Sequence, residues 1–374
     1  MKKILFLLLI SACTSVQKSA TQVKQATADP VAVNQSEQAS PGSFKKPLTG
    51  LVCRDFDRID VANGSDDDMM KITNGIVIQL YWKDIQLQEN APVQRNNKVD
   101  NAINWVRKFK TNHGVEIPIK IRLYSGIFSP DWLINKSYFM LNETKVPKYW
   151  EPHYVAAYAD IQQKLAALYD DVPEISEIEN GGTGIKSAEN FIRPYGLKGK
   201  KAMQNKLFVS AGLTREKDSI AIVKSYNAMV PWKKTLISVC YSSFQYLDRD
   251  GDAHESAALT FPFIDMFIQK FGKQAVIGNN GLRTNAGHNG DDFEEGGERY
   301  KLYNYFKMLH DTKGVTVYFQ TSTTERSGSS LAPVIREGIQ YGAKYIELPT
   351  APRQYRTLLG ADLEPLNKEV KNNR

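Results

Sequence analysis

The sequence contains few of the residues on which metal sites and nucleophilic active sites are usually built. Its 374 residues include three cysteines and five histidines. The histidines are scattered, with no HExxH pair, and there is no GxSxG elbow and no GxxxxGK phosphate loop. The acidic run 248–252 has its glycine misplaced for an EF-hand, so we interpret it as a solvated turn. We therefore predict neither a cofactor nor a metal.

Long apolar runs are also missing, and none approaches the roughly 20 residues that a membrane-spanning helix needs. The apolar run Ile4–Ile10 is much shorter and follows Lys2 and Lys3. Small residues and then Cys13 come directly after it. A positive start, a short apolar core and a small-residue site are typical of a secretory signal peptide.

The end of this signal carries a further resemblance. Ile10-Ser11-Ala12-Cys13 resembles the lipobox of bacterial lipoproteins. The resemblance implies that residues 1–12 are removed and that the Cys13 thiol receives a lipid carrying fatty acids such as palmitate, which holds the protein at the membrane of the cell envelope. Thr14, rather than an aspartate, follows the cysteine, which by the same resemblance implies the outer membrane. An ordinary secretory signal with an accidental cysteine is the alternative.

Composition divides the remaining chain into three parts. Residues 13–46 are rich in Ser, Thr, Gln, Ala and Val, and Phe44 is their only aromatic residue, so we predict a disordered tether. Residues 47–365 are long enough for one large α/β domain, and 366–374 form a polar tail. The formal net charge of +7 comes from scattered basic residues, which does not indicate nucleic-acid binding. We expect a monomer.

Short, β-branched apolar runs alternate with helical stripes along this domain. The eight strand candidates are Leu48–Phe56, Gly75–Trp82, Ile117–Tyr124, Ile175–Asn180, Thr235–Tyr241, Ala275–Asn279, Val315–Gln320 and Lys344–Leu348. Between them, apolar residues recur three and four positions apart, for example in 99–109, 155–168, 302–309 and 331–339. Thr214 is the predicted cap of another helix. The pattern predicts a single-domain (β/α)8 TIM barrel, with the first helix, in 58–73, as its weakest element.

Two of the cysteines lie within predicted strands. Cys53 and Cys240 could form a disulfide in an exported protein, or both could be buried thiols. The strand order places them on opposite sides of the barrel, which favours two free thiols.

In such a barrel the active site lies at the C-terminal ends of the strands. The residues found there include aromatic side chains, which stack on sugar rings, and amides and arginines, which bind hydroxyl groups. We predict that a carbohydrate is bound by Trp82, Tyr124, Trp132, Asn180, Tyr241, Gln245, Asn280, Arg283 and Gln320. Core packing is the alternative role for the two tryptophans.

Several of these segments carry a second resemblance. The runs 75–85 and 129–133, together with 188–193, 279–283 and 319–321, resemble β-galactosidase-like glycoside hydrolases and uncharacterised bacterial proteins of that superfamily. The family usually ends strand four with Asn-Glu and strand seven with Glu. Here strand four ends Glu179-Asn180, and strand seven ends with the amide Gln320.

Glycoside cleavage needs one carboxylic acid and one carboxylate. We assign these roles to Glu189, after strand four, and Glu347, at the end of strand eight, with Glu179 in reserve. The alternative for Glu347 is an ion pair with a barrel lysine or arginine, and for Glu189 a solvated loop position. Two functions follow: a glycoside hydrolase-like lipoprotein that cleaves an oligo- or polysaccharide, or a non-catalytic carbohydrate-binding or cell-envelope lipoprotein on a degenerate barrel.

Overall fold

The computed structural model describes residues 43–54, 73–193, 197–283, 296–321, 331–348 and 363–373. The predicted signal peptide, Cys13 and the tether as far as residue 42 lie outside these ranges. The predicted first helix lies outside them too, apart from its last residue.

Eight parallel strands make up the main sheet, as the apolar runs predict. They are β1 (Gly50–Val52), β2 (Ile76–Tyr81), β3 (Ile119–Tyr124), β6 (Ile175–Glu179), β7 (Leu236–Cys240), β10 (Ala275–Leu282), β11 (Thr316–Thr321) and β12 (Ala343–Glu347). Neighbouring strands in the sheet follow the chain order, from β2 and β3 round to β12 and β1. The first and last strands in the chain, β1 and β12, pair in parallel register.

The sheet closes on itself between β1 and β2. Cys53 forms a parallel bridge with Ile76. Its backbone N–H donates to Gly75 at 2.9 Å, and its carbonyl accepts from Val77 at 2.8 Å. With this bridge the eight strands form a barrel, so the predicted (β/α)8 fold is confirmed. Cys53 and Cys240 are both buried and are not joined to each other by a disulfide, as the strand order favours.

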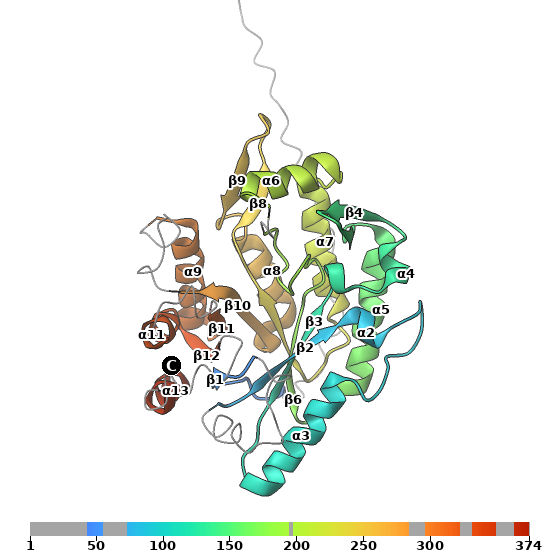
Figure 1. The fold of residues 1–374 in the computed structure, drawn as a ribbon. Helices are drawn as coiled ribbons and strands as arrows, with labels where there is room; N and C mark the ends of the chain where they lie inside the picture. The colour runs from blue at the N-terminus through green and yellow to red at the C-terminus, as the bar shows by residue number, and fades with distance from the viewer. Residues whose placement is uncertain are drawn as a thin grey trace, which may run out of the picture. The chain divides into compact units, whose positions relative to one another are not determined.

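Helices follow the strands and cover the outside of the barrel (Figure 1). The long ones are α3 (Lys98–His113), α5 (Pro152–Tyr169), α7 (Arg215–Ala228), α8 (Phe261–Phe271), α9 (Glu298–Lys313), α11 (Ala332–Gln340) and α13 (Leu363–Asn372). The predicted cap of α7 is confirmed, because the Thr214 hydroxyl accepts the backbone N–H of Lys217 at 3.1 Å. Gly114 ends α3 in a left-handed conformation, with φ at 69°.

The chain departs from a plain barrel in short elements at the C-terminal ends of the strands. The helix α2 (Trp82–Ile85) follows β2, and α4 (Asp131–Ile134) and the hairpin β4 (Tyr138–Leu141) and β5 (Thr144–Pro147) follow β3. After β6 come α6 (Lys200–Gln204) and a π-helical turn, and after β7 the hairpin β8 (Phe244–Leu247) and β9 (Ala253–Ser256). Among these lies the predicted acidic turn, in which the Asp248 carboxylate accepts two backbone N–H groups.

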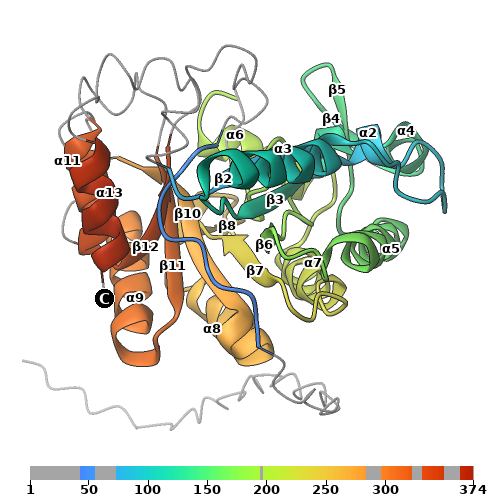
Figure 2. The same cartoon turned by 90° about the horizontal axis from the view of Figure 1, so that it is seen from below.

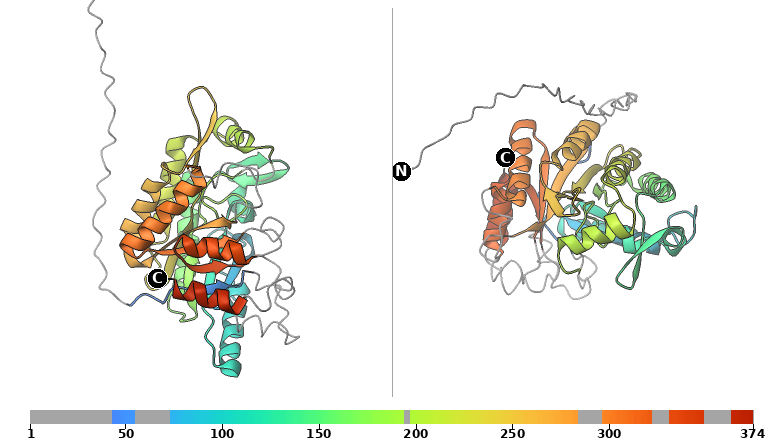
Figure 3. Two further views of the ribbon diagram at one scale, coloured as in Figure 1. Left: turned by 90° about the vertical axis from the view of Figure 1, so that its left-hand side faces the viewer. Right: turned by 90° about the horizontal axis from the view of Figure 1, so that it is seen from above.

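The polar tail predicted from residue 366 is wrong. Residues from Leu363 onward form α13, which lies beside α11 (Figure 3). Leu363, Leu366 and Val370 are buried and recur at helical spacing, so a short apolar stripe holds an otherwise polar segment against the barrel.

The two ends of the barrel differ. We call the end where the strands begin the base, and the end where they finish the mouth. The segment 43–49 lies at the base, where it approaches the end of α8 (Figure 2), and Leu48 packs inside the barrel. With it lie the inward-facing side chains of Val52, Val77, Leu236, Val276, Tyr318 and Tyr345. The lower half of the interior is therefore a packed core.

Among the described residues, no helix has both the length and the apolar character that crossing a membrane requires.

Candidate active site at the barrel mouth

The upper half of the barrel interior is polar, unlike the core at the base. Side chains alternate between the two faces of a strand, so Lys120, Arg122 and Tyr124 of β3 point to one face while Ile119, Ile121 and Leu123 point to the other. Glu177 and Glu179 of β6 lie opposite Lys120 and Arg122 in the strand register. All four of these charged side chains are at most 1% exposed.

Arg122 joins four strands across the mouth. Its Nε donates to Oε2 of Glu179 on β6 at 2.7 Å, its Nη2 lies 2.7 Å from the same oxygen, and its Nη1 donates to Gln320 Oε1 on β11 at 2.9 Å. Its Nη2 also donates to both carboxylate oxygens of Glu347 on β12, at 2.8 and 2.7 Å. Because β3 and β12 are not neighbours in the sheet, these contacts cross the interior.

Lys120 lies one layer deeper and contacts the same acids. Its Nζ is 3.0 Å from carboxylate oxygens of Glu177, Glu179 and Glu347. The ammonium also lies over the Tyr318 ring, 3.6 Å from the centroid, and donates to the Tyr345 hydroxyl at 3.0 Å. Buried charges persist in a protein only when they are paired in this way.

These contacts determine the protonation states of Glu347 and Lys120. Burial raises the pKa of Glu347, but the attraction of Arg122 and Lys120 outweighs burial and holds that pKa below its usual value. Burial likewise lowers the pKa of Lys120, and the three glutamates outweigh it and raise that pKa. We therefore take Glu347 as a carboxylate and Lys120 as an ammonium at neutral pH. Glu347 therefore forms ion pairs with a barrel lysine and a barrel arginine, which is the alternative role given for it above.

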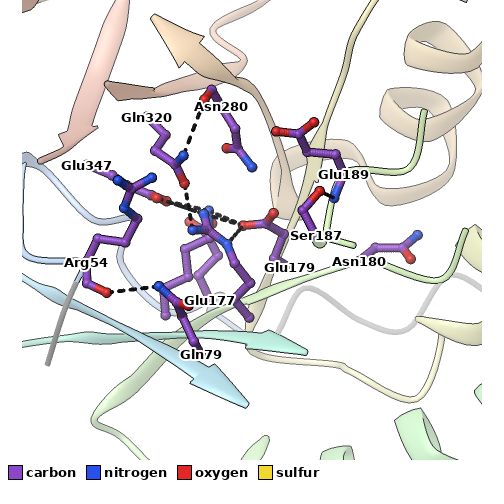
Figure 4. A network of polar contacts seen from close by, with 12 residues as sticks. Arg54, Gln79, Glu177, Glu179, Asn180, Ser187, Glu189, Asn280, Gln320 and Glu347 are labelled. Carbon is purple, nitrogen blue, oxygen red and sulfur yellow. Dashed lines mark hydrogen bonds and ion pairs between the residues drawn. The ribbon is translucent and has the colours of Figure 1, made fainter. Parts of the chain in front are cut away.

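Two buried acceptor atoms at the mouth lack a donor among the described residues. In Figure 4 the polar ends of Glu179, Gln320, Asn280 and Glu347 converge. The Arg122 guanidinium already donates to Glu179, Gln320 and Glu347. Gln320 Nε2 donates to the Asn280 carbonyl at 3.3 Å. Oε1 of Glu179 and Oδ1 of Asn280 are both buried and accept no hydrogen bond from the described residues. A ligand that donates hydrogen bonds would satisfy both atoms.

Glu189 lies at the rim of the mouth, in the loop after β6. Its Oε2 accepts from Arg193 Nε at 2.6 Å, and its side chain is 12% exposed. It is thus a half-buried ion-pair partner rather than a fully solvated loop acid. For Glu189 to protonate a leaving group, this contact with Arg193 would have to open.

Three predicted ligand-binding residues face away from the barrel axis. Trp82 is fully buried, and its indole N–H donates to Gln86 Oε1 at 2.8 Å. The Asn180 side chain is engaged by Tyr158, Ser225 and the Gly182 N–H.

Tyr241 packs in the core, and its hydroxyl lies 3.2 Å from that of Tyr226. The sugar-binding roles predicted for Trp82, Asn180 and Tyr241 do not fit these positions. In each case the preceding residue, Tyr81, Glu179 or Cys240, faces inward.

The other predicted residues lie nearer the mouth. Gln320, Asn280, Arg283 and Tyr124 are half-buried on inward-facing positions or strand ends, and Tyr124 lies edge-on to Tyr81 and Phe128. Trp132 is half-buried in α4, and its indole N–H donates to the Gln86 carbonyl. Gln245, in the hairpin after β7, is 3% exposed. Its side-chain oxygen accepts a hydrogen bond from Gln204 of α6.

The most connected residues of the site were not predicted from the sequence. Lys120, Arg122 and Glu177 lie within strands, whereas the predicted residues lie where strands end. Their signal was present: Ile-Lys-Ile-Arg-Leu and Ser-Glu-Ile-Glu place charges at alternate positions of otherwise apolar strands. Alternating charges in a strand buried on both faces indicate a polar barrel interior.

No protein-family model matches the chain, and its sequence matches no curated protein. Many solved structures match the chain. The catalytic domain of a β-amylase from Paenibacillus polymyxa is 10% identical, with a TM-score of 0.50 over 83% of this chain and 97% of that one. A β-glucanase from Saccharophagus degradans in complex with cellotetraose is 12% identical, with a TM-score of 0.48 over 87% and 89%. The chain is a (β/α)8 barrel. At these identities the likeness concerns the fold alone.

Within the described ranges, no group of three or more His, Cys, Asp or Glu side chains is placed to hold a metal ion. The three central glutamates turn toward Lys120 and Arg122 instead. The chemistry available at the mouth is that of carboxylates, amides and cations.

Proposed function

We propose that this protein is a glycoside hydrolase-like lipoprotein of the cell envelope that acts on an oligo- or polysaccharide at the barrel mouth. The observation that carries the proposal is the pair of buried acceptors without a donor among the described residues, Glu179 Oε1 and Asn280 Oδ1, beside amides and an arginine. Sugar hydroxyls supply the missing donors. The half-buried rings of Tyr124, Tyr81 and Phe128 add an apolar rim for sugar C–H groups. The lipid on Cys13 would hold the barrel at the outer membrane.

In the hydrolytic form of the proposal, Glu347 is the ionised carboxylate and Glu189 the acid. An ionised Glu347 suits a nucleophile or base, because Arg122 and Lys120 favour its charged form. Glu179 is the reserve acid. One oxygen each of Glu179 and Glu347 lies 2.7 Å from the same Arg122 nitrogen. These two oxygens are therefore no more than twice that distance apart, which compares with about 5–5.5 Å between the carboxyl groups of retaining enzymes.

A second candidate, binding without cleavage, is favoured by a different observation. Arg122 fills the space between Glu179 and Glu347, and strand seven ends with Gln320, which cannot act as a nucleophile. In this form the same residues recognise a glycan, and the ion network gives the mouth a fixed shape.

Activity on aryl glycosides and envelope polysaccharides tests the proposal, with Glu189→Gln and Glu347→Gln beside the parent. Loss of cleavage in both variants, each still folded by circular dichroism, supports the hydrolytic form. If the parent cleaves a substrate and both variants keep its rate, the assignment fails. If nothing is cleaved but a glycan binds, the second candidate holds. If the panel shows neither cleavage nor binding, both candidate functions are refuted.

A further inference from the structure

The base of the barrel carries a group of exposed lysines that the mouth does not use. Because all eight strands are parallel, the segments that precede them meet at the same end. Lys46 precedes β1, Lys233 and Lys234 precede β7, and Lys273 precedes β10, and all four are exposed. Arg107, Lys110 and Lys313 lie at the ends of α3 and α9 on the same side.

Contacts between these segments bring the lysines together. Lys45 N donates to the Lys234 carbonyl at 2.9 Å, and Lys45 Nζ donates to the Val172 carbonyl and to Thr235 Oγ1 at 2.7 and 3.0 Å. Gln274 Nε2 donates to the carbonyls of Trp232 and Thr235, which joins the segment before β10 to the one before β7. Lys46, Lys233 and Lys273 therefore lie on three adjoining segments.

Helix geometry does not account for Lys46 and Lys233, whereas Lys273 lies in the 3-10 turn that follows α8 directly. Basic residues at helix ends are common because they interact favourably with the helix dipole, which explains Lys110 and Lys313. Nearby acids also neutralise part of the base, since Arg107, Lys110 and Lys234 pair with Glu174, Glu116 and Asp171. Lys46 and Lys233 lie outside helices, Lys273 lies in a single 3-10 turn, and none of the three has an acidic partner among the described ion pairs.

We propose that the base of the barrel, centred on Lys46, Lys233 and Lys273, docks on anionic phospholipid headgroups. The proposal rests on the lipid anchor at Cys13. The described chain begins at this same end, and about 30 residues separate it from Cys13. At up to about 3.5 Å per residue, that length allows the barrel any orientation. The charge of the base then sets the orientation, and the mouth faces away from the membrane toward its glycan.

Vesicle binding by the mature chain, residues 13–374 with Cys13→Ala and so without signal peptide or lipid, tests the docking surface. We expect it to co-sediment with vesicles of phosphatidylglycerol and phosphatidylethanolamine at low salt, and not with phosphatidylcholine alone or in high salt. A lysine near an anionic surface contributes about five-fold to binding. The triple variant Lys46→Gln, Lys233→Gln, Lys273→Gln should therefore bind roughly 100-fold more weakly.

The matched control removes three exposed lysines from segments at the mouth: Lys145→Gln, Lys198→Gln, Lys217→Gln. It should bind as the parent does. Equal losses in both triple variants would show that only overall charge matters and would overturn the proposal, as would parent binding in the base variant or no binding to anionic vesicles. Because this assay uses neither glycan nor acylated protein, its failure is distinguishable from failure of the proposed function.

Discussion

Removing the Arg122 guanidinium should cost more stability than any other single change at the mouth. Arg122→Met leaves Glu179 and Glu347 buried, each at 0% exposure, with Lys120 as their shared cation. Breaking a buried ion pair by deleting one partner costs about 3–5 kcal/mol. Arg122 serves two carboxylates, but Lys120 stays 3.0 Å from both, so we expect about 4 kcal/mol.

Urea and thermal unfolding at pH 7 measure this cost. A loss of about 4 kcal/mol corresponds to a fall in Tm of roughly 6 °C, because a domain of about 320 residues unfolds with an entropy of about 0.7 kcal/mol/K. The control is Arg107→Met, which removes an exposed pair with Glu174 and should cost no more than about 1 kcal/mol.

A triple variant, Arg122→Met, Glu179→Gln, Glu347→Gln, separates charge from packing. Without the carboxylates there is no uncompensated buried charge, so most of the lost stability should return. A loss under about 1 kcal/mol for Arg122→Met would refute the reasoning. A triple variant less stable than Arg122→Met would refute it as well.

Three further predictions follow from other parts of the chain. Burial raises the pKa of Asp218 to about 7, against a hydrogen bond from Tyr149 that lowers it, so its stabilising contribution is lost as pH rises through 7. Asp218→Asn should raise the Tm relative to the parent more at pH 8.5 than at pH 5, and an equal difference at both would contradict this. The lowered pKa of Glu347 acts in the opposite sense: its contribution is present above about pH 4.3 and lost as pH falls through the folded value. The stability that Glu347→Gln loses relative to the parent should therefore be smaller in acid than at neutral pH. In cells, Cys13→Ala should abolish fatty-acid labelling and membrane fractionation, and a variant that still labels and pellets would end the lipoprotein proposal.

The fold could be predicted because its signal is repeated. Eight apolar strands alternate with helical stripes, and a misjudged boundary, such as the long first strand predicted to Phe56, leaves the pattern intact. The C-terminal helix α13 was harder to predict, because its apolar stripe covers only ten residues and the segment is otherwise polar.

The site was predictable only in part, because it depends on which face each side chain takes. The predicted strand ends lie within one residue of the observed ends in six of the eight strands, but a shift of one position reverses the direction of a side chain in a strand. Trp82, Asn180 and Tyr241 thus lie in the core, while Tyr81 and Glu179 face inward. The pairing of Arg122 with Glu347 joins residues 225 positions apart, and no local pattern in the sequence reveals such a contact.

Glycan binding at the mouth is the most direct test of the central claim. Titration calorimetry against an oligosaccharide panel should find a ligand for the parent, and Asn280→Ala and Gln320→Ala should weaken its binding at least 10-fold. Asn304→Ala, on the outer helix α9, should bind as the parent does. A glycan that binds both mouth variants as tightly as the parent, or a panel without any ligand, would contradict the account.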